Sequence, residues 1–295
     1  MSFPLPRSVS EGSTLAIVAP AGPFDEEAFR KGVEWLELRY NLTFSSDIFS
    51  KSGYLAGTDE RRLCELSGAI NDDKVDAILC ARGGFGTTRL LPGIELSEIQ
   101  SANKMIVGFS DISALHARWA AAGVRSMHAP MVAALGSSSP PIRERWTDCL
   151  ESPGETRLHR LEQLNGTSET DAEGRLCGGN LAVLCALNGT PYAPLLDDAI
   201  FFIEDVGERP YRIDRMLTTL RQSGWFDRIR GLIIGTFTEG DPGPDEVSLD
   251  DVLTGHFGKS PFPVLRGLSS GHIKENEPLV FGSTARITGG TLEIF

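Results

Sequence analysis

The sequence has 295 residues, enough for one large domain or two ordinary ones, and 41% of them are hydrophobic and 23% charged. This composition is that of a globular protein and excludes a globally disordered chain. The net charge of −12 repels phosphate backbones, so nucleic acid is not an expected partner.

The sequence gives no sign of a membrane span or of an oxidising compartment. No stretch approaches the ~20 apolar residues that a membrane span requires. Residues 1–13 lack the apolar region of a signal peptide. The five cysteines are an odd number without Cys-x-x-Cys spacing, which predicts reduced thiols in a cytoplasmic protein. Cys177 and Cys185 have no paired ligand set for zinc, so no metal is expected.

In chain order, the first half alternates strand-like and helix-like segments. Apolar runs of strand length occupy residues 14–19, 76–80 and 104–108, and apolar residues at helical spacing occupy 25–39, 58–70 and 111–122. Strands that alternate with helices form βαβ units, so residues 1–150 are predicted to form a domain with a parallel sheet. Ligands of such sheets bind at the carboxyl ends of the strands.

The second half has a different pattern. Periodicity fades over residues 151–175, where turn residues cluster, so this segment is predicted to be a linker or mobile loop. Residues 176–295 then mix helices with strands, and Gly289-Gly290 lies between two alternating runs, a strong hairpin signal. The sequence therefore predicts an α/β fold with a parallel-sheet domain at residues 1–150 and a smaller α+β or β-rich domain at residues 176–295.

Ser110 lies where the apolar run 104–108 meets a predicted helix. This junction exposes a side chain at the carboxyl end of a strand, beside helix N–H groups that stabilise negative charge. A serine hydroxyl is a weak nucleophile, and it needs a base that is itself oriented by a third group. The residue after Ser110 is Asp111, so the motif is not Gly-x-Ser-x-Gly. Ser110 is a candidate nucleophile, and a simple helix cap is the alternative.

The five histidines limit the choice of base. His272 lies in a polar loop between apolar segments, and catalytic bases are often carried by loops on a rigid scaffold. The alternative for His272 is a surface turn. His116 lies on the helix after Ser110, and His128 ends a predicted strand. His116 is interpreted as a structural residue or a neighbour of a site.

Glu204 follows the apolar strand 200–203. An acid at the end of such a strand is either an orienting carboxylate or the start of a solvated turn. Asp205 and Glu208 compete with it for the orienting role. The alternative is an ion-pair network with the neighbouring Arg209, Arg212 and Arg215.

The segment Arg82-Gly-Gly-Phe-Gly-Thr-Thr88 is glycine-rich and follows a predicted strand. Glycines allow a backbone N–H group to approach a reacting group closely. The pattern is neither Gly-x-Gly-x-x-Gly nor a Gly-Lys-Ser/Thr loop, so support for a phosphate or dinucleotide site is weak. The other interpretation is an oxyanion hole, in which a glycine N–H acts together with the N–H after a nucleophile.

Taken together and in order, these segments resemble the L,D-carboxypeptidase family, a serine peptidase family that also contains microcin C self-immunity proteins. The resemblance spans nearly the whole chain. The matching segments are Val18-Ala-Pro-Ala-Gly22, Arg82-Gly-Gly-Phe-Gly86, Arg89-Leu-Leu-Pro92, Gly108-Phe-Ser-Asp-Ile-Ser-Ala-Leu-His116, Gly178-Gly-Asn-Leu181, Gly189-Thr-Pro-Tyr192, Phe202-Ile-Glu-Asp-Val-Gly-Glu208, Pro210-Tyr-Arg-Ile-Asp-Arg-Met-Leu217 and Gly271-His272.

The resemblance implies a Ser–Glu–His triad in which Ser110 is the nucleophile, Glu204 the orienting carboxylate and His272 the general base. It also implies that the backbone N–H groups of Gly84 and Asp111 bind the oxyanion. The implied fold has an N-terminal Rossmann-like domain with the nucleophile and a C-terminal domain with Glu and His, and the site lies between them. Members are commonly homodimers, and no metal or cofactor is required.

The substrate implied by the resemblance is a cytoplasmic murein tetrapeptide that loses its terminal D-Ala in peptidoglycan recycling. Arg82 is a candidate for binding the free terminal carboxylate. One alternative is the microcin-immunity branch, which cleaves peptidyl or aminoacyl nucleotides and stacks tryptophans on the adenine. Residues 151–179 contain no Trp, Tyr or Phe for such stacking, although Trp146 lies just before them. The other alternative is a non-catalytic α/β module that binds a ligand at the glycine-rich loop.

The chain departs from the usual family wording at two positions. Phe109 stands where Tyr is usual before the serine, and Ala129 stands where Gly is usual after His128. Phe109 lacks the hydroxyl but keeps the aromatic ring. Neither departure changes a member of the implied triad.

Overall fold

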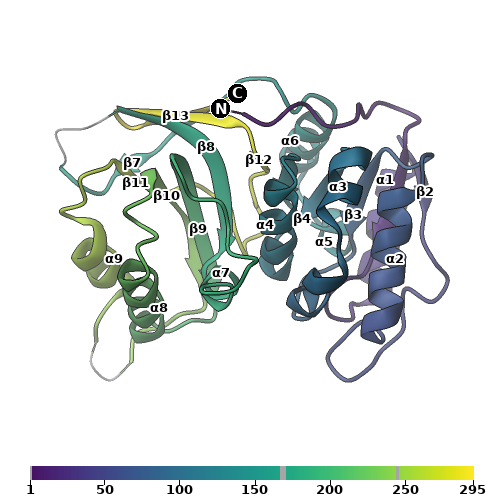
Figure 1. The fold of residues 1–295 in the computed structure, drawn as a ribbon, viewed down its shortest axis with the longest axis horizontal. Helices are drawn as coiled ribbons and strands as arrows, with labels where there is room; N and C mark the ends of the chain where they lie inside the picture. The colour runs from purple at the N-terminus through teal and green to yellow at the C-terminus, as the bar shows by residue number, and fades with distance from the viewer. Residues whose placement is uncertain (1, 167–170, 244–245) are drawn as a thin grey trace.

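The computed structural model describes residues 2–166, 171–243 and 246–295 and contains two β-sheets (Figure 1). The first sheet consists of β1 (Thr14–Val18), β2 (Asn41–Thr43), β3 (Ala77–Cys80), β4 (Met105–Gly108), β5 (Ser126–His128) and β12 (Leu279–Phe281). The strand order is β12-β5-β4-β3-β1-β2. Strands β1 to β5 pair in parallel, and β12 runs antiparallel to β5.

Helices cover both faces of this sheet. They are α1 (Glu26–Leu36), α2 (Asp59–Asn71), α3 (Leu96–Ala102), α4 (Ser113–Ala121), α5 (Val132–Leu135) and α6 (Pro140–Glu151). Successive strand residues point to opposite faces, so Leu15 and Ile17 of β1 pack in one apolar core with α1, α5 and α6. Ala16 and Val18 pack in the other core, with α2, α3 and α4. The predicted βαβ pattern and parallel sheet are confirmed.

The second sheet has eight strands in the order β6-β14-β13-β8-β9-β10-β11-β7. Its strands are β6 (Arg157–Arg160), β7 (Glu162–Gln163), β8 (Asp171–Asn180), β9 (Ala199–Val206), β10 (Ile229–Thr238), β11 (Val264–Arg266), β13 (Thr284–Thr288) and β14 (Thr291–Ile294). Strands β8 to β11 are parallel, and the outer strands are antiparallel. The predicted hairpin at Gly289 joins β13 to β14.

One face of this sheet packs on three helices, α7 (Leu181–Ala186), α8 (Pro210–Gln222) and α9 (Leu249–Phe257). Phe201 of β9 lies in this core with apolar residues of all three helices. Phe202 points to the opposite face and packs with Phe281 of β12. The second half therefore mixes helices with a mostly β architecture, as predicted.

The structure differs from the sequence prediction at the segment between the two halves. A linker or mobile loop is predicted over residues 151–175, but these residues contribute β6, β7 and the start of β8. Strands β6 and β7 are the two edges of the second sheet, and β6 alternates half-buried with exposed residues. Short, polar edge strands carry no apolar periodicity, so the sequence pattern does not reveal them. Residues 167–170 of the predicted loop lie outside the described residues.

The two sheets are joined by the crossing of the chain at β12. This strand follows β11 of the second sheet, yet it pairs with β5 of the first. The loop of residues 267–278 therefore runs from one sheet to the other. Among the helices of the described residues, none is long and apolar enough to cross a membrane.

Candidate active site

Ser110 occupies a strained turn directly after β4. Its φ angle is +64°, in the left-handed region that non-glycine residues rarely adopt. The residue begins the short 3₁₀ helix Ser110–Ile112, which leads into α4. The N-cap residues of these two helices are Phe109 and Ile112, and neither helix end has a side-chain cap hydrogen bond. Ser110 is therefore not a helix cap, and its hydroxyl is available for another partner.

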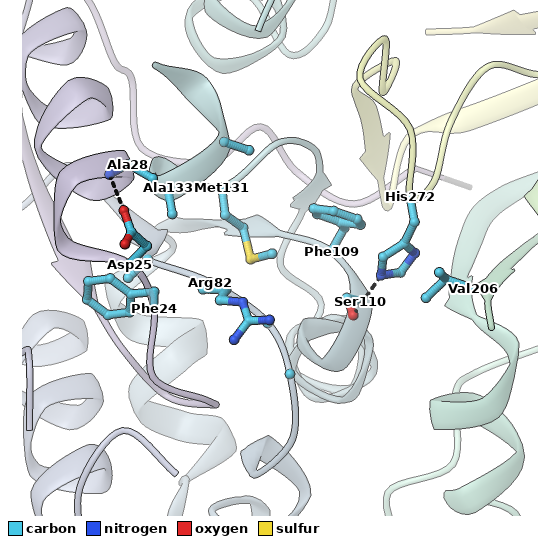
Figure 2. Close-up of a pocket in the computed structure, with 14 residues that line it drawn as sticks. Phe24, Asp25, Ala28, Arg82, Phe109, Ser110, Met131, Ala133, Val206 and His272 are labelled. Carbon is cyan, nitrogen blue, oxygen red and sulfur yellow. Dashed lines mark hydrogen bonds between the residues drawn. The ribbon is translucent and has the colours of Figure 1, made fainter. Parts of the chain in front are cut away.

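That partner is His272, which comes from the loop between β11 and β12. Its Nε2 lies 3.0 Å from Oγ of Ser110 (Figure 2), and its Nδ1 lies 2.8 Å from Oε2 of Glu204. An ionised carboxylate only accepts hydrogen bonds, so the Glu204 contact places the ring proton on Nδ1. The Nε2 lone pair then faces the serine hydroxyl. The ring of Phe109 packs against the imidazole, with centroids 4.8 Å apart, so the departure from Tyr keeps this contact.

Gly271 allows the close approach of this loop to Glu204. Its φ angle is +136°, and a Cβ atom at this position would lie 2.9 Å from Oε2 of Glu204 and 3.0 Å from the carbonyl oxygen of Thr236. Both contacts are shorter than ordinary van der Waals distances, so a side chain at this position must displace the carboxylate or the strand.

We therefore expect Gly271→Ala to lower kcat/KM by about 100-fold, because a displacement of about 1 Å at a catalytic group has effects of that size. Gly267→Ala is the matched control, since Gly267 lies in the same loop with φ +94° and a Cβ atom there would have open space within 4 Å. Steady-state kinetics of both variants test the prediction. Equal losses in the two variants would show that backbone strain, rather than the contact with Glu204, sets the effect.

The glycine-rich loop passes directly against Ser110. A Cβ atom at Gly83 would lie 3.0 Å from Cβ and 3.2 Å from Oγ of Ser110. The loop is fixed from behind by Asp111, whose Oδ2 accepts a hydrogen bond from the N–H of Thr87 at 2.8 Å. The Thr87 hydroxyl donates in turn to the carbonyl oxygen of Asp111 at 2.6 Å. These bonds tie the glycine-rich loop, which carries Gly84, to the turn that carries Ser110 and Asp111.

A cavity of about 550 Å³ opens beside the serine and is lined by charged and apolar side chains. Figure 2 shows Arg82 projecting into the space between Phe24 and Ser110. The Arg82 guanidinium donates to the carbonyl oxygen of Pro23 at 2.7 Å and has no ion-pair partner within the described ranges. Asp25 also lines the cavity, but its carboxylate caps α1 by accepting from the N–H of Ala28.

Comparison with known proteins identifies the family. Residues 15–129 match the model of the LD-carboxypeptidase N-terminal domain, and residues 173–287 match that of the LD-carboxypeptidase C-terminal domain. The chain belongs to the LD-carboxypeptidase family. It is therefore a hydrolase of the carboxypeptidase type, and the resemblance stated from the sequence is confirmed.

Three relatives illustrate the match. The chain is 33% identical to a probable murein peptide carboxypeptidase of Bacillus subtilis, over 95% of this chain and 90% of that protein. It is 26% identical to the microcin C7 self-immunity protein MccF of Escherichia coli, over 86% of this chain and 83% of that protein. The solved structure of a muramoyltetrapeptide carboxypeptidase from Oxalobacter formigenes superimposes with a TM-score of 0.86 at 27% identity, covering 96% of this chain and 98% of that one.

Among the three competing acids of this LD-carboxypeptidase, only Glu204 reaches His272 in the described structure. Glu204 is fully buried at the end of β9. Burial alone would raise the pKa of its carboxyl, but the polar interactions with His128 and His272 outweigh burial and lower the pKa below its usual value. The carboxylate is therefore ionised at neutral pH. Glu208 forms an ion pair with Arg212 instead.

Asp205 points away from His272 and serves the packing of β9 on β8. Its Oδ1 accepts from the side-chain amide of Asn180 and its Oδ2 from the N–H of Ala182, each at 2.9 Å. Burial raises the pKa of this carboxyl to about 6, and the neighbouring charge of Glu204 adds to the shift. A raised pKa means that Asp205 favours folding when it is protonated. This contribution is complete below the ordinary pKa of 3.8 and is lost as the pH rises through about 6.

We expect Asp205→Asn, which cannot ionise, to gain about 2 kcal/mol in the free energy of unfolding relative to the wild type between pH 4 and pH 7. The loss of the carboxylate acceptor lowers the stability of the variant by the same amount at every pH. The test is therefore how the difference between the two free energies of unfolding changes with pH. Urea denaturation of both proteins across this pH range measures it. A difference that stays constant with pH would contradict the raised pKa.

Two buried histidines complete the surroundings of the site. Nε2 of His116 contacts the carbonyl oxygen of Gly108 at 3.0 Å, and burial lowers the pKa of this histidine to about 3, so it is a neutral structural residue. His128 ends β5, and its Nε2 lies 4.0 Å from Oε1 of Glu204. Sequence reasoning did not connect His128 with Glu204, because the two residues lie on different sheets and no local pattern links them.

No group of three or more His, Cys, Asp or Glu side chains is arranged to hold a metal ion in the part of the chain that the structure describes. The sequence expectation that the enzyme needs neither a metal nor a cofactor stays a prediction.

Proposed function

We propose that this chain is a serine-type L,D-carboxypeptidase that removes the terminal D-amino acid, D-Ala, from murein tetrapeptides. In this proposal Ser110 is the nucleophile, His272 the general base and Glu204 the orienting carboxylate. The observation that carries it is the continuous chain of contacts from Glu204 through both ring nitrogens of His272 to Ser110, at 2.8 and 3.0 Å. A carboxylate, an imidazole and a serine hydroxyl in this order are the arrangement that activates a serine for nucleophilic attack.

In the first step, Nε2 of His272 accepts the proton of Ser110 while Oγ attacks the carbonyl carbon of the amide bond before the D-residue. The N–H groups of Gly84 and Asp111 would hold the negative oxygen of the tetrahedral intermediate. His272 then gives its proton to the leaving amine, and the D-amino acid departs from the acyl-enzyme. A water molecule, activated by the same imidazole, hydrolyses the ester. Throughout these steps, ionised Glu204 stabilises the imidazolium.

A carboxypeptidase must also recognise a free terminal carboxylate, and Arg82 is our candidate for this role. Its guanidinium lines the cavity beside Ser110, and its described hydrogen bond is to an uncharged backbone oxygen. The positive charge is therefore not neutralised by the contacts of the described chain. A guanidinium binds a carboxylate through two parallel hydrogen bonds, which fixes the position of the scissile bond.

The second candidate function is hydrolysis of a peptidyl or aminoacyl nucleotide, as in the microcin-immunity branch. Two observations favour the murein substrate. Identity to the Bacillus subtilis relative is 33%, against 26% to MccF. In addition, Trp146 is completely buried and donates from Nε1 to the carbonyl oxygen of Pro130, so it does not present a face to an adenine. Residues 151–179 contain no aromatic residue that could replace it.

A non-catalytic ligand-binding module is the alternative of another class. The family membership and the polar contacts of Ser110 disfavour it, because a binding loop for phosphate has no need of a buried carboxylate–histidine pair aimed at a serine. We also propose, from the family resemblance alone, that the enzyme acts in the cytoplasm as a homodimer.

The deciding experiment incubates the full chain with a murein tetrapeptide ending in D-Ala, with the same peptide ending in L-Ala, and with a peptidyl-adenylate analogue. We expect release of D-Ala from the first substrate only, followed by mass spectrometry. Release of the nucleotide instead would select the microcin-type function. A folded protein that hydrolyses none of the three would contradict the enzyme proposal.

A further inference from the structure

The second carboxylate oxygen of Glu204 lacks a hydrogen-bond donor in the described structure. Oε2 contacts His272, but Oε1 is buried without a hydrogen-bond partner among the described residues. A buried carboxylate oxygen without a donor is costly, and buried polar atoms in native proteins are almost always paired. A group close to Oε1 is therefore expected to supply the missing N–H.

His128 is that group. Its Nε2 is also buried and has no hydrogen-bond partner in the described part of the chain, and it lies 4.0 Å from Oε1. The side chain is completely buried, and the rings of Phe109, Phe202 and Phe281 surround it. Nδ1 lies 3.4 Å from Oγ of Ser270, whose hydroxyl donates to the carbonyl oxygen of Glu277 at 2.8 Å. An ionised carboxylate only accepts hydrogen bonds, so a bond between Nε2 and Oε1 of Glu204 requires the proton on Nε2.

A separation of 4.0 Å is too long for a hydrogen bond, but a small rotation of either side chain closes it. Catalytic hydrogen bonds are often long in the free enzyme and tighten in the complex with substrate. The contact between His128 and Glu204 also joins the two sheets, because β5 belongs to the first sheet and β9 to the second. His128 thus reaches across the two sheets to the carboxylate that orients His272.

We propose that His128 is a positioning residue of the triad: its Nε2–H donates to Oε1 of Glu204 and fixes the plane in which Oε2 meets His272. An apolar residue in this aromatic surrounding would be simpler to bury, so the presence of an imidazole is explained by the donor that it supplies. The inference rests on the proposed roles of Ser110, His272 and Glu204. It adds a fourth side chain that touches neither the substrate nor the serine.

The test compares His128→Gln, whose side-chain N–H₂ can take the place of Nε2–H, with His128→Leu, which fills a similar volume without a donor. We expect His128→Leu to lower kcat by about 10- to 100-fold with KM changed by less than about twofold, since a second-layer partner acts on chemistry rather than on binding. His128→Gln should keep at least about one third of kcat. Thermal unfolding of both variants provides the stability comparison.

A double-mutant cycle separates positioning from simple packing. In a Glu204→Gln background, His128→Leu should cost less than about twofold, because the carboxylate through which His128 acts is already gone. The rate of Ser110 labelling by a fluorophosphonate, followed by intact-mass spectrometry, gives the same comparison without a peptide substrate. If Ser110 of the wild type is labelled but no D-Ala is released, the substrate proposal is wrong. The labelling rates of the variants would still decide the role of His128.

Three results would overturn the inference. One is a His128→Gln variant as slow as His128→Leu. Another is an equal loss from His128→Leu with Glu204 and with Gln at position 204. The third is unchanged labelling of Ser110 in His128→Leu. A wild-type protein that neither labels nor hydrolyses any substrate would overturn both the triad and the role of His128.

Discussion

Replacing Ser110 with alanine is expected to lower kcat for release of the terminal D-residue by at least about 10⁴-fold, because the Ser110 hydroxyl is the proposed source of the attacking oxygen. The fold should be kept, since alanine and serine both carry a Cβ atom and tolerate the φ angle of +64° equally. The variant should bind the tetrapeptide with a Kd close to that of the wild type. Stopped assays for D-Ala and calorimetric titration of the peptide measure the two quantities.

Two further variants sharpen this prediction. Ser137→Ala removes an exposed hydroxyl that bonds to the carbonyl oxygen of Ala134, and it should leave kcat within about twofold. Ser110→Gly should be as inactive as Ser110→Ala but more stable by about 1 kcal/mol, because glycine adopts a positive φ angle without strain. Turnover above about 1% of the wild-type rate in Ser110→Ala would contradict its role as the nucleophile.

Glu204→Gln is expected to lower kcat by about 10³- to 10⁴-fold while keeping the volume of the side chain. An amide neither stabilises an imidazolium nor enforces a proton on Nδ1 of His272, so the lone pair of Nε2 is no longer held toward Ser110. Kinetics with the tetrapeptide and fluorophosphonate labelling of Ser110 both report this loss. Glu208→Gln is the matched control, since Glu208 is one of the competing acids and pairs with Arg212 at the surface. It should retain nearly full activity.

The same substitution has a consequence for acid stability. The two neighbouring histidines lower the pKa of Glu204 in the folded state against the effect of burial, so its ionised form stabilises the fold above the ordinary pKa of 4.5. This stabilisation is lost as the pH falls through the lowered pKa. The glutamine variant has no such loss, so its free energy of unfolding should fall less than that of the wild type on acidification.

A Glu204→Gln enzyme within tenfold of wild-type kcat would show that another group orients His272.

The architecture of the first half follows directly from its sequence. The apolar runs that form β1, β3 and β4 are bounded by turn and helix signals, and parallel strands bury both faces, so their pattern is visible locally. The position of Ser110 at the end of β4 could be predicted in the same way. What local patterns could not show is the partner of that serine, because His272 lies 162 residues farther along the chain.

The family resemblance supplied that long-range pairing, whereas other long-range features had no counterpart in the sequence. The edge strands β6 and β7 are too short and too polar to produce a periodic signal. The contact between His128 and Glu204 depends on how two sheets meet, and strand patterns describe only one sheet at a time. Contacts between residues that are far apart in the sequence are the part of the site that could be seen only in the structure.

The crossing of the chain at β12 makes the two halves interdependent in their assembly. A fragment ending near residue 150 would lack β12, and β5 would then present an open edge to other molecules. The complementary fragment would carry β12 without a sheet to join. The loop with His272, the proposed general base, is anchored at one end in each half, so this histidine reaches Ser110 only when both halves have folded together. We therefore expect the fold and the proposed active site to be completed together.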